Sequence, residues 1–136
     1  MRKSHLYKNA IVMKWITVVL MLCVSLMSNA QDLKKAIIKE SSEKATAFVA
    51  ETDKILNLSE KQAKQIYQLR MELSMAIRII YLQHGKQAKT LDIFKQAQHD
   101  FEFGMRKVLK EDQLITWNEH RKQVYLESQP QLSVLE

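Results

Sequence analysis

The sequence predicts an all-α protein of about four helices that follow a short N-terminal leader. Three observations lead to this fold class. Apolar residues recur at helical spacing between residues 31 and 127, no segment alternates as a strand would, and the connections between segments are short. Short connections favour antiparallel neighbours, so the helices are expected to pack side by side. A chain of 136 residues forms at most one domain.

The first thirty residues have the composition of a secretory signal peptide. Positive charges precede an apolar run of thirteen residues at 15–27, and Ser28-Asn29-Ala30 supplies the small residues of a cleavage site. The run is shorter than the ~20 residues that span a bilayer. We therefore expect export to the periplasm with cleavage after Ala30, and attachment to the membrane only if the leader stays uncleaved.

Removal of the leader changes the charge and the cysteine content of the chain. Four of the 21 Lys and Arg residues lie before Gln31 and none of the 15 Asp and Glu residues does, so 17 basic and 15 acidic residues remain. This balance argues against nucleic acid as a partner, because such a role needs a strongly basic mature domain. Cys23, the single cysteine, lies in the leader, so the mature chain has no disulfide and no thiol chemistry.

The first mature helix is expected over residues 31–57, which contain neither Gly nor Pro. Its apolar residues share one face. They are Ile37, Ile38, Ala45, Phe48, Val49, Ile55 and Leu56.

Leu58-Ser59-Glu60-Lys61-Gln62 then begins the central helix. The Ser59 hydroxyl can accept from the amide of Gln62, while the Gln62 side chain returns to the amide of Ser59. Leu58, just before the cap, is placed to pack on the first turn. This capping box predicts a helix over residues 60–84, because Gly85 fits the position after a helix C-terminus.

The central helix carries two apolar stripes. The first forms a core face of Ile66, Leu69, Leu73, Ala76, Ile77 and Ile80. The second stripe consists of Met71, Met75, Ile79 and Leu82, with Tyr67 and Arg78 at its edges. One stripe is enough for folding, so the second needs its own explanation. Three interpretations are open: a core covered on both sides, a homodimer interface, or an exposed surface for unfolded clients.

Two further helices complete the chain. Thr90 is the expected cap of the third helix, whose core face consists of Leu91, Phe94, Ala97, Phe101, Met105, Val108 and Leu109. Phe103 points away from that face and is a candidate partner residue. The fourth helix is expected over residues 111–127, with Leu114, Trp117, Val124 and Tyr125 buried. Residues 128–136 follow as an expected disordered tail that contains Pro130.

The start of the fourth helix repeats the start of the central one. Leu109-Lys110-Glu111-Asp112-Gln113 follows Leu58–Gln62 at an offset of 51 residues, with Lys110 in place of the capping hydroxyl. The leader, the two motifs and Trp117 together resemble the Spy/CpxP family of envelope proteins, which is marked by two LTxxQ motifs. The similarity covers roughly residues 44–121. The first motif has Ser59 for Thr, and the second keeps only Leu109 and Gln113.

This resemblance implies a bent helical hairpin that pairs into a cradle-shaped homodimer in the periplasm. It also implies one of three activities. The protein would be an ATP-independent chaperone for unfolded envelope proteins, a regulatory partner of an envelope-stress sensor kinase, or a metal-responsive sensor. Under all three, Leu58, Ser59, Gln62, Leu109 and Gln113 are helix caps that mark the fold and carry out no chemistry.

The residues themselves argue against an enzyme. No nucleophile stands in a pattern with a base and an orienting group, and Gly85 and Gly104 cannot form a phosphate-binding loop. After cleavage three histidines remain, and no two have the i, i+4 spacing of a helical metal pair. Met71 and Met75 could offer two soft ligands to Cu(I), but a third is not evident. We therefore expect no catalytic residue, no metal site and no cofactor.

Overall fold

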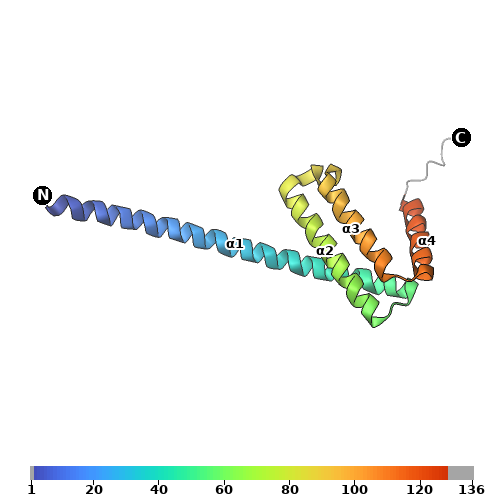
Figure 1. The fold of residues 1–136 in the computed structure, drawn as a ribbon. Coiled ribbons are helices and arrows are strands. Elements are labelled where there is room, and N and C mark those ends of the chain that lie inside the picture. The colour runs from blue at the N-terminus through green and yellow to red at the C-terminus, as the bar shows by residue number, and fades with distance from the viewer. Residues whose placement is uncertain (1, 129–136) are drawn as a thin grey trace. The chain divides into compact units, whose positions relative to one another are not determined.

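The computed structural model describes residues 2–128, with side chains described from Ser28 onward, and its regular structure in that range is helical (Figure 1). The predicted all-α fold is confirmed. The elements are α1 (Arg2–Leu56), α2 (Glu60–His84), the 3₁₀ helix η1 (Gly85–Thr90), α3 (Asp92–Val108) and α4 (Glu111–Ser128).

The chain divides into two compact units, Met1–Ile38 and Lys39–Glu136, and α1 contributes to both. The predicted leader falls in the first unit. The candidate site lies in the second, which is described up to Ser128. Residues 129–136, which include most of the predicted tail, lie outside the described residues.

The junction of α1 and α2 follows the predicted capping box. Ser59 Oγ accepts from the Gln62 amide at 3.1 Å, and Gln62 Oε1 accepts from the Ser59 amide at 3.0 Å. α1 ends at Leu56, one residue earlier than predicted, because Asn57 takes a left-handed conformation with φ of 50°. The Asn57 amide still donates to the carbonyl of Asp53 at 2.8 Å. The bond from Asn57 therefore closes α1, and the capping box opens α2.

The connection between α2 and α3 differs from the prediction. Gly85 ends α2 as expected, with φ of 58°. Residues 85–90 then form η1 rather than a loop, and α3 begins at Asp92 after Leu91. Thr90 does not cap α3, because its hydroxyl donates to the carbonyl of Gln87 at 2.8 Å. The prediction was wrong because this bond holds Thr90 inside the 3₁₀ turn.

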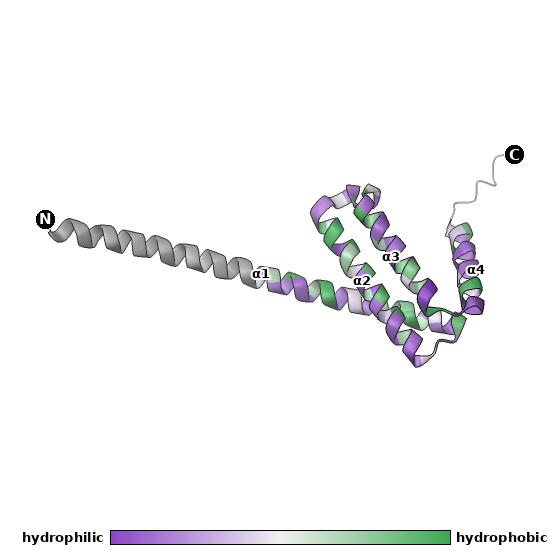
Figure 2. Ribbon diagram, in the orientation of Figure 1, coloured by the Kyte–Doolittle hydropathy of each residue, from purple (hydrophilic) through white to green (hydrophobic). Residues whose placement is uncertain are grey.

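The core of the second unit confirms the predicted core faces of α2 and α3. The main buried cluster consists of Leu56, Ile66, Leu73, Phe101, Met105, Leu109 and Trp117. A smaller cluster of Ile80, Ala88 and Phe94 joins η1 to the helices beside it. Edge-to-face ring pairs support both clusters, Phe48 with Phe101 at 5.6 Å and Tyr81 with Phe94 at 6.0 Å. Figure 2 shows hydrophobic residues along the length of α2 and α3.

Gly104 lets α3 lie close to α2. A Cβ atom at this position would come within 2.5 Å of Leu69 Cδ2. Because Leu69 packs against the main cluster, its movement would disturb the core.

The packing of α4 departs furthest from the prediction. Trp117 is buried as expected, but Leu114 is only half-buried and every residue from 118 to 128 is exposed. Val124 and Tyr125, which were predicted to be buried, are 49% and 63% exposed. The prediction was wrong because these side chains line an open groove beside α1 instead of contacting the core. α4 also continues to Ser128, a residue predicted to belong to the tail.

Candidate functional site

The two motif glutamines lie together in the core and hydrogen-bond to each other. Gln62 Nε2 donates to Gln113 Oε1 at 2.7 Å, and Gln113 Nε2 donates to Gln62 Oε1 at 3.3 Å. Both side chains are buried. The offset of 51 residues in the sequence therefore brings two equivalent positions into contact.

The remaining hydrogen bonds of these amides tie four helix ends together. Gln62 Nε2 also donates to the carbonyl of Val108 at 3.0 Å, and Gln113 Nε2 to the carbonyl of Leu56 at 3.1 Å. Gln113 Oε1 accepts from the Lys110 amide at 3.0 Å, as Gln62 Oε1 accepts from Ser59. The first two bonds reach the ends of α3 and α1. The last two hold the starts of α4 and α2.

We call this arrangement of Gln62 and Gln113 the glutamine clasp. Every donor and acceptor position of the two amides is used, so the pair can be buried without an unpaired polar group. Leu109 is buried and Leu58 is half-buried beside the same cluster. The side chains of Gln62 and Gln113 therefore hold the helix ends together.

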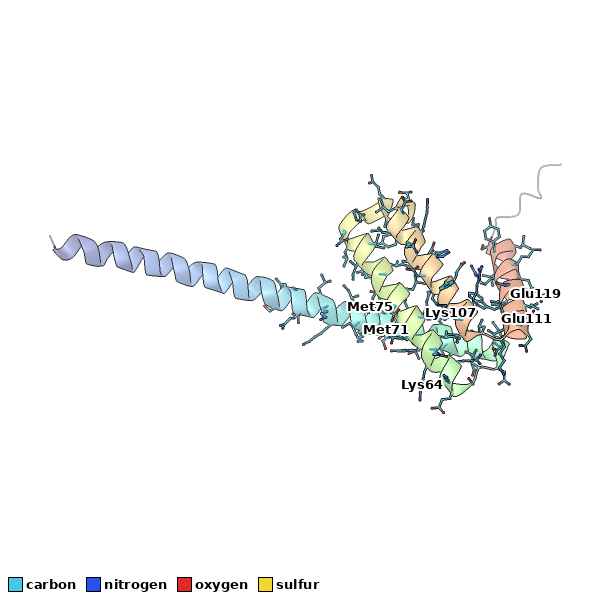
Figure 3. All side chains as sticks on the ribbon, viewed as in Figure 1. Lys64, Met71, Met75, Lys107, Glu111 and Glu119 are labelled. Atoms are coloured by element: carbon cyan, nitrogen blue, oxygen red, sulfur yellow. The ribbon has the colours of Figure 1, made fainter. Side chains whose placement is uncertain are left out.

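The second stripe of α2 lies outside the core. Met71 and Met75 are half-buried (Figure 3), whereas Ile79 and Leu82 are 42% and 49% exposed. None of the four belongs to a buried cluster of the described residues. This placement counts against the interpretation of the stripe as simple core.

The residues at the edge of the stripe contact α1. The Tyr67 hydroxyl lies 2.7 Å from Ser42 Oγ, and Arg78 Nε lies 3.5 Å from the carboxylate of Glu40. Tyr67 is half-buried and Arg78 is exposed. Both side chains therefore make contacts within the protomer, where α1 crosses α2.

The exposed end of the stripe continues into a groove between α2 and α3. Its apolar walls are Ala76, Ile79 and Ile80 on α2, and Ile93 and Ala97 on α3. We call it the hairpin groove. Ile93, which is 51% exposed, was missed in the sequence because it lies beside the core face of its helix. The sequence did contain one signal for this wall. Ile93 and Phe94 are adjacent and apolar, but only Phe94 fits the core face of the helix.

The rim of the hairpin groove consists of polar side chains that hydrogen-bond to neighbours on their own helix. Asp100, which lines the groove, accepts from Gln96 Nε2 at 2.8 Å. A smaller hollow that shares Ala76, Ala97 and Asp100 continues towards Leu69 and has Glu72 on its wall. Glu72 accepts from Gln68 Nε2 at 2.8 Å. The groove thus combines an apolar floor with an acidic edge.

A second groove separates the second half of α4 from α1. Phe48 and Ile55 of α1 face Trp117, Val124 and Tyr125 of α4 across it, and we call it the C-terminal groove. Arg121 also lines this groove, and its guanidinium lies 4.6 Å from the centre of the Trp117 ring and 2.6 Å from the Glu102 carboxylate.

Phe103 is not part of either groove. It is 53% exposed on α3, and Lys107 Nζ lies 4.3 Å above its ring. The structure therefore separates Phe103 from Ile79 and Leu82, with which it was grouped as a candidate partner surface. It provides a natural control for experiments on the grooves.

His84, His99 and His120 are all exposed, and from Ser28 to Ser128 no three His, Cys, Asp or Glu side chains are placed to hold a metal. Within the same described part, no helix is both long and apolar enough to cross a membrane.

Comparison of the chain with models of known families, with curated proteins and with solved structures gave no match.

Proposed function

We propose that this protein is a periplasmic, ATP-independent chaperone-like protein of the Spy/CpxP type, which holds unfolded envelope proteins on its apolar grooves. The observation that carries the proposal is the exposure of large apolar side chains inside two grooves of a folded helical unit. Single exposed apolar residues are ordinary. Apolar residues gathered in a groove with a polar rim are typical of a binding surface.

The chemistry of the grooves suits an unfolded client. An unfolded chain presents short apolar segments, and the grooves offer Ile79 with Ile93, and Ile55 with Val124 and Tyr125, for such segments to cover. The half-buried Met71 and Met75 lie beside the exposed end of the stripe on α2, and methionine adapts to varied partners because it is flexible and unbranched. Contact through apolar area requires no defined sequence and no nucleotide.

The same surfaces are candidates for a homodimer interface. A second copy could cover one groove while the other stays open to clients, so dimerisation and client binding are compatible. Analytical ultracentrifugation of the purified protein measures dimerisation. A monomeric mass at all concentrations would leave both grooves to clients.

Suppression of aggregation tests the proposal. Two unrelated, chemically unfolded proteins are diluted with and without this protein, in the absence of ATP. We expect both clients to stay dispersed. The variant Ile79→Ser with Ile93→Ser should lose most of this activity while it keeps its helical content, because both side chains are already about half exposed.

Phe103→Ser is the matched control, because it removes a side chain that is equally exposed but lies outside the grooves. Equal loss of activity in the control and in the groove variant would refute the assignment to the grooves. Binding of one saturable partner without general suppression of aggregation would favour the regulatory partner of a sensor kinase. A thermal shift that depends on a metal would favour a sensor.

The proposed location has its own test. N-terminal sequencing of the exported protein should start at Gln31. An intact leader in the membrane fraction would show that the protein is tethered to the membrane and would contradict the proposed soluble periplasmic form.

A further inference from the structure

A small cavity between α1 and α2 is lined by more basic than acidic side chains. Six charged or polar side chains line it: Glu40, Lys44, Arg70, Ser74, Arg78 and Tyr81. Its volume is about 240 Å³. Because drug-sized pockets occupy roughly 300–1,000 Å³, this cavity has room for a small ion or a single functional group.

Arg70 is a half-buried cation without a counter-charge. Its guanidinium carbon lies 5.0 Å from the Phe48 ring and 5.9 Å from the Phe101 ring. Its Nε atom is buried and has no hydrogen-bond partner among the described residues, and no carboxylate of that part of the chain pairs with it. Burial lowers the pKa of Arg70, and no neighbouring acid acts against this shift. The two rings stabilise part of this charge, and an anion would offset the rest of the cost of its partial burial.

Ser74 supplies a second unpaired donor to the same cavity. The residue is 9% exposed, and its Oγ atom has no hydrogen-bond partner in the described structure. Ser74 follows Arg70 by four residues, so both side chains lie on the same face of α2. Unpaired buried polar atoms are rare in folded proteins, and two beside one cavity indicate a missing acceptor.

The remaining charges leave the cavity positive. Glu40 Oε1 lies 2.7 Å from Lys44 Nζ, and Glu40 Oε2 lies 3.5 Å from Arg78 Nε. The hydrogen bond and the charge of Lys44 lower the pKa of Glu40, so this carboxylate is ionised at neutral pH. One anion therefore faces three cations.

We propose that this cavity binds a phosphate group. Arg70 Nε and Ser74 Oγ are closed to solvent in the free protein, so these two side chains would turn toward the cavity to hold the anion while Lys44 and Arg78 supply charge. Arg70, Ser74 and Arg78 lie on α2 and Lys44 lies on α1, so N–H and O–H groups from two helices surround the cavity, which suits the several acceptor oxygens of a tetrahedral anion. Arginine binds such anions through its fork of N–H groups. The group would come from free phosphate or from the headgroup of an anionic phospholipid. This site is independent of the apolar grooves and of the chaperone proposal.

Thermal unfolding with inorganic phosphate tests the site. Phosphate should raise the melting temperature in a saturable way, whereas chloride at equal ionic strength should not, because screening is then the same. Ser74→Ala preserves charge and removes the unpaired hydroxyl. The free variant should be at least as stable as the parent, while its affinity for phosphate falls about tenfold.

Three charge variants complete the test. Arg70→Gln should abolish the phosphate effect, and Arg106→Gln, the same change at an exposed position of α3, should leave it intact. Glu40→Gln should raise the affinity, because it removes the anion that competes for Lys44 and Arg78. Equal shifts with phosphate and chloride would overturn the site, and so would equal losses in Arg70→Gln and Arg106→Gln.

Vesicles distinguish the two sources of phosphate. Binding to phosphatidylglycerol vesicles but not to phosphatidylcholine vesicles, with a loss in Ser74→Ala, would assign the site to a lipid headgroup. A saturable shift with inorganic phosphate and no binding to vesicles would assign it to the free ion. The absence of both would refute the proposal.

Discussion

Replacement of Gln113 by alanine should destabilise the protein more than any helix-cap substitution. The change removes four hydrogen bonds: those to the Lys110 amide and the Leu56 carbonyl, and the two shared with Gln62. Each bond contributes about 1 kcal/mol net, and a partner left buried and unpaired costs about 1–3 kcal/mol. Allowing for water in the vacated space, we expect a loss of about 3–5 kcal/mol from the free energy of unfolding.

This loss is a large share of the stability of a small domain, which is about 5–15 kcal/mol. The melting temperature should therefore fall by roughly 12 °C or more. Urea unfolding followed by far-UV circular dichroism measures the free energy directly. Gln68→Ala is the matched control, because Gln68 is exposed and bonds only to Glu72 one turn away on α2. It should cost no more than about 0.5 kcal/mol.

A double-mutant cycle isolates the contact between the two glutamines. Gln62→Ala should cost a similar amount, and the double variant should cost less than the sum of the two by about 1–3 kcal/mol. The reason is that each single variant leaves the other amide buried with unpaired atoms. Additive costs, or a Gln113→Ala variant as stable as the Gln68→Ala control, would show that the clasp does not form.

Three further substitutions test the local geometry, each by thermal melting. Ser59→Ala should cost about 1 kcal/mol, because it removes the acceptor of the Gln62 amide; a more stable variant would place the start of α2 elsewhere. Lys110→Thr should be neutral or stabilising, because α4 lacks a capping hydroxyl, and a large loss would contradict this reading. Gly104→Ala should cost about 1–3 kcal/mol despite its better helix propensity, because the new methyl group would displace Leu69; a gain in stability would show that α2 and α3 are further apart.

The elements that could be predicted from sequence depend on local chemistry. The start of α2 at Glu60 follows from Ser59 and Gln62, three residues apart, and the core faces follow from helical periodicity. The pairing of Gln62 with Gln113 could not be predicted in this way. Once each glutamine had a local role as a cap, nothing in the sequence indicated where its amide nitrogen would donate.

The candidate site was predicted only in part, because a groove needs two walls. The stripe with Ile79 follows from one helix, but the second wall with Ile93 depends on the rotation of α3 against α2. The exposure of Val124 depends in the same way on how α1 lies beside α4. The burial of Arg70 against Phe48 could not be predicted either, because it is a contact between distant segments of the chain.

The clasp and the grooves place separate demands on the fold. A protein that binds unfolded chains through apolar side chains must keep those side chains from collapsing onto one another, because apolar attraction has no preferred direction. The hydrogen bonds of Gln62 and Gln113 are directional, so they can fix the helix ends without the burial of Ile79 or Ile93. Groove variants should therefore change client binding at a nearly constant melting temperature. Clasp variants should lower the melting temperature and leave the client binding of the folded protein nearly unchanged. A groove variant that melted as early as Gln113→Ala would return Ile79 and Ile93 to the core and leave the C-terminal groove as the remaining client surface.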